Sequence, residues 1–220
     1  MQFDPLQAQF VGAGLDRPEC VLCTHDGFLY AADWRGGISM TSPDGKSKFI
    51  GKQGNPSGVL PNGIALERQG TFLLADLGEQ GGLWRLDRDG GIEPVLREVE
   101  GEILPPSNFV LVDRQQRTWL TVSTRLQPRA LGYREDVRDG FIVLLDGQGA
   151  RVVADGLGYT NEVQLDPPGK YLYVNETFAR CTSRFPVGDD GSLGRREVVA
   201  EYGHGTFPDG LCFDAEGGLW

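Results

Sequence analysis

Residues 61–76 have the sequence PNGIALERQGTFLLAD, in which two runs of apolar and small residues flank a turn that contains glycine. Short apolar runs on either side of such a turn are typical of a β-hairpin. The pattern recurs as PECVLCTHDGFLYAAD (18–33), SNFVLVDRQQRTWLT (107–121), TNEVQLDPPGKYLYVN (160–175) and PDGLCFDAEGGLW (208–220). The chain is therefore built from repeats, and each repeat begins with a hairpin.

Each complete repeat continues beyond its hairpin. A third strand is predicted at 82–86 and at 182–185, followed by turns such as DRDG (87–90) and DDG (189–191) and then by a fourth strand. Four strands and three turns need a period of about 40–50 residues, which is typical of a β-propeller blade. The sequence therefore predicts an all-β propeller of four-stranded blades, with residues 1–220 forming a single domain.

The repeats differ in length and in completeness. The longest holds a polar stretch with a proline, residues 125–138, which we predict to be a loop on one face of the propeller. The fifth repeat stops at Trp220, inside its second strand. Because a propeller closes to protect its edge strands, we expect the sequence to be part of a longer chain, with roughly one and a half blades beyond it. The alternative is closure by pairing with another copy.

Composition excludes several classes of protein. The chain has 220 residues, enough for a sizeable core, and a net charge of -10, which argues against nucleic acid as a partner. The N-terminus has no signal-peptide pattern, and no apolar run approaches the roughly 20 residues of a membrane helix. The four cysteines are spaced too irregularly to indicate a disulfide framework. We therefore expect a soluble cytoplasmic protein that does not bind membranes.

One position of the repeat carries an oxygen-bearing side chain in every copy. Equivalent positions in a propeller are related by rotation about its axis, so these side chains are expected to converge at one mouth of the central channel. Carboxylate and amide oxygens suit a hard divalent cation such as calcium. The alternative is that the Asn and Asp residues only cap turns, but Glu is a poor turn residue. Successive members lie 43, 46, 53 and 48 residues apart, and they are Glu19, Asn62, Asn108, Asn161 and Asp209.

These motifs, taken in order, resemble the senescence marker protein / gluconolactonase / regucalcin family. The resemblance extends from about Leu15 to the end of the chain. It implies a six-bladed propeller with one divalent metal on its axis, hydrolysis of sugar lactones and, in some relatives, of organophosphates. The metal ligands would correspond to Glu19, Asn161 and Asp209, and a substrate-contacting amide to Asn108.

The chain departs from the family pattern beside two of these residues. Cys20 and Glu162 stand where glycine is common, and both adjoin an expected ligand, so the substrate preference is open. Cys20 also begins a CxxC with Cys23. No second CxxC occurs, and residues three apart on a strand face opposite sides, so buried thiols are expected rather than a zinc site. Cys20 as a soft ligand of a thiophilic metal is the alternative.

The residue types favour a metal-dependent lactonase. A divalent cation would polarise the lactone carbonyl and acidify a bound water, with Asp209 as the candidate general base and Asn108 holding the substrate. Calcium is favoured, although magnesium, manganese, iron(II) or zinc could occupy such a site. Further candidates for contact with the small-molecule substrate are Asn62, Arg125 and His204, for each of which a rim or solvated role is the alternative.

Two other functions remain open from the sequence. One is a calcium-binding propeller without turnover, and the other is a phosphotriesterase-like hydrolase that uses the same metal site. The sequence contains no GxSxG pattern, which would indicate a serine nucleophile, and no HExxH pattern, which would indicate a zinc-protease helix.

Overall fold

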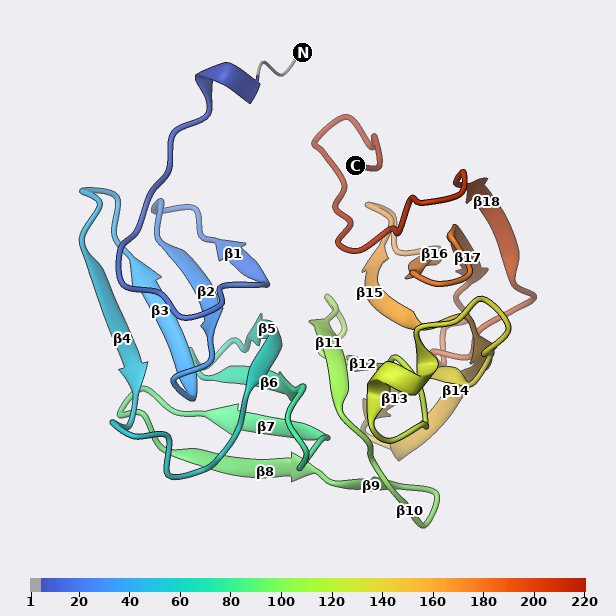
Figure 1. The fold of residues 1–220 in the computed structure, drawn as a ribbon, viewed down its shortest axis with the longest axis horizontal. Coiled ribbons are helices and arrows are strands. Elements are labelled where there is room, and N and C mark those ends of the chain that lie inside the picture. The colour runs from blue at the N-terminus through green and yellow to red at the C-terminus, as the bar shows by residue number, and fades with distance from the viewer. Residues whose placement is uncertain (1–4) are drawn as a thin grey trace.

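The computed structural model describes residues 5–220, and nearly all of its regular structure is β-strand (Figure 1). Within this range two short 3₁₀ helices, η1 (Pro5–Gln7) and η2 (Arg129–Gly132), accompany the strands. No helix of residues 5–220 has the length and apolar character needed to cross a bilayer. The fold class expected from the repeat is thus confirmed.

The described strands form four antiparallel sheets of four strands, which we call blades 1 to 4, and each consists of consecutive strands. Blade 1 contains β1 (Val21–Cys23), β2 (Leu29–Asp33), β3 (Gly37–Thr41) and β4 (Ser47–Gly51). Blade 2 contains β5 (Pro61–Leu66), β6 (Phe72–Asp76), β7 (Leu83–Leu86) and β8 (Ile92–Leu96). Blade 3 contains β11 (Ser107–Val112), β12 (Thr118–Val122), β13 (Gly140–Asp146) and β14 (Gly149–Leu157). Blade 4 contains β15 (Thr160–Leu165), β16 (Tyr171–Glu176), β17 (Cys181–Pro186) and β18 (Glu197–Glu201).

A small hairpin of β9 (Glu98–Val99) and β10 (Glu102–Ile103) connects blades 2 and 3. The blades follow one another along an arc, with the first strand of each nearest the centre (Figure 1). Each inner strand contacts the next, from β1 to β5, β5 to β11 and β11 to β15. This is the propeller arrangement that the repeat predicts.

Apolar side chains between neighbouring blades form the core. One cluster extends through all four blades, from Ile38 in blade 1 to Trp119 in blade 3 and Val174 in blade 4, and these side chains are fully buried. Burial of a large apolar side chain stabilises a fold by about 1.5–3 kcal/mol. Packing between blades therefore holds the inner strands at fixed positions around the axis.

Gly63 lets the inner strands of blades 2 and 3 approach closely. A Cβ atom at this position would lie 2.5 Å from the Cα of Phe109 and 2.7 Å from the backbone nitrogen of Val110. The contact brings the preceding residue, Asn62, to Asn108, whose carbonyl oxygen accepts a hydrogen bond from Asn62 Nδ2 at 3.0 Å. The glycine thus sets the separation of two residues of the oxygen-bearing position.

A buried carboxylate ends the second strand in three of the four blades. Asp33, Asp76 and Glu176 are fully buried. Each accepts a backbone hydrogen bond from the segment that leads into the first strand of its own blade, which fixes where that inner strand starts. The three bonds run from Asp16 N to Asp33 Oδ2 (3.2 Å), from Leu60 N to Asp76 Oδ1 (2.8 Å) and from Gly158 N to Glu176 Oε2 (2.8 Å).

The fifth repeat starts a hairpin, as expected from the sequence. Cys212 and Trp220 exchange backbone hydrogen bonds of 3.0 and 2.9 Å. The Trp220 indole donates to Asp214 at 2.8 Å, as the Trp119 indole donates to Asp113 at 3.1 Å in blade 3. The pairing is limited to this hairpin and contains one bridge, so it is shorter than a full pair of strands.

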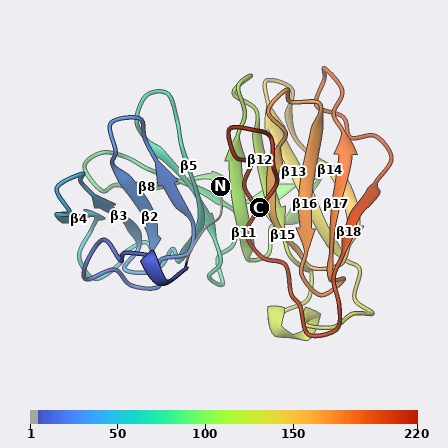
Figure 2. The same cartoon turned by 90° about the horizontal axis from the view of Figure 1, so that it is seen from above.

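The polar stretch of the longest repeat forms a loop between β12 and β13 and includes η2. Figure 2 shows this loop beyond the end of the sheets, on the same side of the propeller as the red segment that follows β18. The starts of the inner strands lie on this side as well, because the second strand of each blade ends there.

Candidate metal centre

The oxygen-bearing residues lie at the starts of the inner strands. Asn62, Asn108 and Asn161 are the second residues of β5, β11 and β15, and their exposed fractions are 5%, 5% and 6%. Glu19 precedes β1, with 30% of its side chain exposed. Asp209 opens the fifth repeat and is exposed. The repeat position therefore lies at one end of the inner strands, where the sequence predicts the mouth of the channel.

Asn161 and Asp209 are in direct contact. Asn161 Nδ2 donates hydrogen bonds to Asp209 Oδ1 at 2.5 Å and to Thr177 Oγ1 at 2.9 Å. Both amide hydrogens are thereby used. Asn161 Oδ1 and Asp209 Oδ2 accept no hydrogen bond from the described residues, which leaves one oxygen of each side chain available to a ligand.

Blade 4 holds the backbone around Asp209 in place. Asn175 Nδ2 donates to the carbonyl oxygens of Asp209 and Gly210, at 3.0 Å each. Thr177 Oγ1 donates to the carbonyl oxygen of Pro208 at 2.9 Å. The end of β16 therefore fixes the start of the fifth repeat against Asn161.

A second set of contacts joins Glu19 to Asn62 and Asn108. Arg17 Nη1 donates to Asn62 Oδ1 at 3.0 Å and lies 3.4 Å from Glu19 Oε2. Asn62 Nδ2 lies 3.5 Å from Asn108 Oδ1, besides its bond to the Asn108 carbonyl. Blades 1, 2 and 3 are thus linked by one chain of polar contacts at the mouth.

The charge of Glu162 interacts with both sets of contacts, through Asp209 in the first and Glu19 in the second. Its Oε2 accepts a hydrogen bond from the backbone nitrogen of Leu211 at 3.3 Å. Burial, with a smaller contribution from the negative charges of Asp209 and Glu19, raises the pKa of Glu162 to about 7. The Glu162 carboxylate is therefore repelled by the carboxylates of Asp209 and Glu19 at this mouth, and a bound cation would relieve that repulsion.

The donor set fits a hard divalent cation. Among residues 5–220, no three His, Cys, Asp or Glu side chains are near enough to one another to hold a metal by themselves. A centre here would therefore need an amide oxygen, and Asn161 Oδ1 is free for that role. Glu19, Asn161 and Asp209 would supply two carboxylates and one amide, the oxygen ligands that such ions prefer.

Cys20 is a buried thiol rather than an available soft ligand. Its Sγ donates a hydrogen bond to the Ile64 carbonyl at 3.7 Å. Burial raises the pKa of Cys20 to about 12. Because the thiolate is the form that binds metals, the protonated thiol is a poor ligand. The expectation of two buried thiols is wrong for Cys23, which is exposed at the end of β1.

The structure does not bring Arg125 and His204 into contact with this group. The Arg125 guanidinium pairs with Asp155 on β14, the outermost strand of blade 3, at 2.8 Å. It also lies over the Phe141 ring, 4.2 Å from its centroid. His204 lies in the exposed loop between β18 and the fifth repeat. A role for either residue in substrate binding stays a prediction.

Sequence reasoning missed Arg17, Asn175 and Thr177. Arg17 stands two residues before Glu19, outside the oxygen-bearing position, so the repeat gives it no signal. Asn175 and Thr177 flank the buried Glu176 at the end of the second strand. The sequence does give one signal that polar residues cluster there, because a carboxylate recurs at the end of the second strand in three blades.

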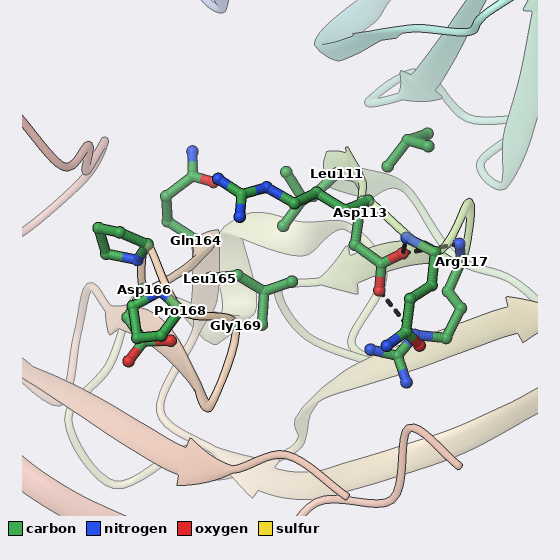
Figure 3. Close-up of a pocket in the computed structure, with 12 residues that line it drawn as sticks. Leu111, Asp113, Arg117, Gln164, Leu165, Asp166, Pro168 and Gly169 are labelled. Carbon is green, nitrogen blue, oxygen red and sulfur yellow. Dashed lines mark hydrogen bonds and ion pairs between the residues drawn. The ribbon is translucent and has the colours of Figure 1, made fainter. Parts of the chain in front are cut away.

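A pocket of about 330 Å³ lies between blades 3 and 4 at the far end of the inner strands (Figure 3). It is lined by the turns that follow β11 and β15, including Asp113, Arg117 and Asp166. Asn108 and Asn161 lie at the starts of these same strands. This pocket is therefore separate from the mouth that gathers the carboxylates.

The comparisons with known proteins agree with the fold. A family model described as "SMP-30/Gluconolactonase/LRE-like region" matches residues 18–220. A protein of Pseudomonas putida named 6-deoxy-6-sulfogluconolactonase is 29% identical over 161 residues, which are 71% of this chain and 52% of that protein. The chain thus spans about half the length of this curated relative.

Two solved structures share the fold. A gluconolactonase of Xanthomonas campestris has a TM-score of 0.72 and 23% identity, over 89% of this chain and 65% of that one. A calcium-binding protein of Agrobacterium tumefaciens, regucalcin, has a TM-score of 0.72 and 18% identity, over 94% of this chain and 68% of that one. At these identities the likeness concerns the fold alone.

Proposed function

Because the chain belongs to the SMP-30/gluconolactonase/LRE-like family, we propose that it is part of a metal-dependent hydrolase that opens sugar-derived lactones. The contact between Asn161 and Asp209 carries this proposal, since it leaves one oxygen of each residue free beside a group of mutually repelling carboxylates. The sugar-lactone class is supported by the name of the Pseudomonas putida relative. We further propose that the complete propeller is one domain of six blades.

The residues that would hold the cation are Glu19, Asn161 and Asp209. When bound, a divalent cation supplies Lewis acidity toward the lactone carbonyl and lowers the pKa of a coordinated water. Calcium is the candidate that the all-oxygen donor set favours. Because Asn161 Nδ2 is fixed by Asp209 and Thr177, the amide oxygen keeps its orientation without a ligand.

Asp209 is the proposed general base. Its Oδ1 accepts the Asn161 hydrogen bond, so Oδ2, which has more than one lone pair, would face the cation and also take a proton from the attacking water. Water adds its hydroxyl to the acyl carbon and the ring C–O bond breaks. The ring oxygen leaves as a hydroxyl group with the proton that Asp209 delivers. The product carboxylic acid then ionises.

Asn108 and Asn62 would orient the substrate. The buried Asn62 is engaged by Arg17 and by the Asn108 carbonyl, so it fixes the position of Asn108. The Asn108 side chain would then hydrogen-bond to the ring oxygen or hydroxyl groups of a lactone. Correct placement of the reacting groups lowers the barrier by avoiding the entropy loss of a chance encounter.

Proton release during lactone hydrolysis tests this function. The full-length protein that contains this chain is assayed on aldonolactones, on a phosphotriester and on a simple aryl ester, with Asn161→Ala as a matched variant. We expect hydrolysis of an aldonolactone that falls at least about 100-fold in the variant, because loss of even an outer-shell partner of a metal costs about 10–100-fold. Preference for the phosphotriester would support the alternative hydrolase, and no turnover on any ester would contradict the proposal.

A further inference from the structure

Arg17 is a positively charged side chain at the mouth of the channel, and the proposed function gives it no role. Its guanidinium lies 3.4 Å from Glu19 Oε2 and donates to Asn62 Oδ1, and Asn62 in turn contacts Asn108. It therefore belongs to the same chain of contacts as three residues of the proposed site, although it does not belong to the repeat position that defines them.

Three features hold the guanidinium in place. It stacks on the Trp34 ring at 4.2 Å from the centroid, and the backbone nitrogen of Trp34 donates to the Asp16 carbonyl at 2.9 Å. Arg17 itself has a φ of 44°, in the left-handed region that non-glycine residues rarely adopt. Such strained positions persist where the surrounding structure fixes them, and they concentrate at functional sites. The side chain is thus fixed rather than loosely solvated.

The fixed guanidinium keeps donors to spare. Both polar contacts of the side chain use Nη1, and Nε and Nη2 donate to no acceptor among residues 5–220. The Arg17 side chain is 35% exposed, so these donors are within reach of a ligand. A guanidinium edge with two parallel N–H groups matches a carboxylate or another oxyanion in geometry as well as in charge.

The negative charge of the chain makes the positive charge of Arg17 important for binding an anion. With a net charge of -10, and with three carboxylates at the mouth, an anionic substrate would be repelled unless a local positive charge offset that field. A neutral sugar lactone has no need of such a group, because its hydroxyls can be bound by amides such as Asn108.

We infer that Arg17 recognises an anionic substituent of the substrate, so that the preferred lactones are those of acidic sugars, which carry a carboxylate or sulfonate away from the lactone ring. This inference rests on the proposed lactonase function. Arg17 acts as a specificity residue, because the reacting ester is the same in charged and neutral substrates.

Two γ-lactones that differ only in the group at the last carbon provide the test. The γ-lactone of D-gluconic acid is neutral, whereas the γ-lactone of D-glucaric acid that keeps its last carbon as a free carboxylate is anionic. We expect Arg17→Gln to lower kcat/KM on the anionic lactone by about tenfold more than on the neutral one, the loss typical of one charge-assisted hydrogen bond. Arg17→Lys should restore part of the preference.

Arg184 offers a matched control. It stacks on Tyr171 at 4.3 Å, pairs with Glu197 at 2.9 Å and has a side chain 32% exposed, but it lies on β17, two strands away from the inner strand of its blade. Arg184→Gln removes the same charge and should leave the ratio of the two kcat/KM values unchanged. An equal loss on both lactones in Arg17→Gln, or no loss on either, would overturn the inference.

Binding of D-glucarate keeps the two proposals separable. Calorimetry on the wild-type protein and Arg17→Gln, with D-glucose as the neutral ligand, needs no turnover. If no lactone is hydrolysed but glucarate binds in an Arg17-dependent manner, the lactonase proposal fails and the anion site stands. Glucarate binding of equal strength in both proteins, or none in the wild type, would contradict the anion site whatever the activity.

Discussion

Asn161 and Asp209 lie 48 residues apart in the sequence, yet Asn161 Nδ2 donates a 2.5 Å hydrogen bond to Asp209 Oδ1. The two residues occupy the same position of consecutive repeats, at the start of β15 and of the fifth repeat. Their contact shows that this position meets in two consecutive repeats. It also fixes which oxygen of each side chain remains free.

The first prediction concerns proton transfer. Asp209→Asn keeps an oxygen that can accept the Asn161 hydrogen bond but removes the base, so kcat for lactone hydrolysis should fall about 100-fold or more. The melting temperature should change little, because Asp209 is exposed. Steady-state kinetics with a thermal melt on the same preparation measures both. Full activity in the variant would assign the base elsewhere.

The second prediction concerns the charge of Glu162. Glu162→Gln keeps the acceptor for Leu211 N and removes one of the three carboxylates at the mouth. Affinity for a divalent cation should fall about tenfold, because a nearby negative charge favours the bound cation through space. Calorimetric titration with calcium measures the change. Glu197→Gln, on the outer strand β18, is the control and should leave the affinity unchanged.

The third prediction compares two buried aspartates. Burial acts to raise the pKa of Asp33, but hydrogen bonds from Arg35 and Ser39 outweigh it and lower that pKa below its ordinary 3.8. Burial raises the pKa of Asp76 above 3.8, since backbone donors compensate only in part and Asp76 Oδ2 has no partner among the described residues. The contributions of the two carboxylates to the stability of the fold should therefore depend on pH in opposite directions.

The signs follow from the pKa shifts. Charged Asp33 stabilises the fold at pH values above 3.8, and this stabilisation is lost as the pH falls through the lowered folded pKa. Charged Asp76 destabilises the fold above its raised folded pKa, and this penalty disappears as the pH falls toward 3.8. Urea unfolding of Asp33→Asn and Asp76→Asn from pH 7 to 3 measures both differences from the wild type.

At pH 7, Asp33→Asn should lower the free energy of unfolding by about 1–3 kcal/mol, from the loss of charge-assisted hydrogen bonds. This deficit should shrink below pH 4. The stability of Asp76→Asn relative to the wild type should instead become less favourable as the pH falls toward 3.8. Parallel pH profiles for the two variants would contradict the assigned environments.

The fourth prediction concerns Gly63. A Cβ here would meet backbone atoms of Phe109 and Val110, which cannot move aside as a flexible side chain could. Gly63→Ala should therefore destabilise the protein by about 1–3 kcal/mol, as overpacking does. Gly147→Ala is the control, because nothing lies within 4 Å of its Cβ position. Equal melting temperatures for the two variants would argue against the close approach of β5 and β11.

Much of the fold could be predicted from the sequence, because strand alternation and turn glycines repeat with the period of a blade. Residues 61–76, for example, form β5 and β6 within one residue of the expected strands. The loop at 125–138 was also predictable from its polarity and its proline. The limited pairing at Cys212–Trp220 was not, since strand length depends on the neighbours that pair with it.

The site could be predicted only in part. The equivalence of the repeat positions predicts that the five oxygen-bearing side chains lie close together. The contact between Asn161 and Asp209 shows this for two of the five residues. The role of Arg17 could not be predicted, because its contacts to Glu19 and Asn62 depend on a turn with positive φ and on stacking against Trp34. Cys23 shows a further limit: it is exposed at the end of the short strand β1, although residues on an inner strand are expected to be buried.

The measurement that tests the central proposal most directly is metal content together with activity. The full-length protein is stripped with a chelator, and lactone hydrolysis is measured before and after calcium, magnesium, manganese or zinc is added back. The account predicts one divalent ion per chain, loss of activity on stripping, recovery with a metal, and neither binding nor recovery in Asn161→Ala. Undiminished hydrolysis by the metal-free protein would contradict it.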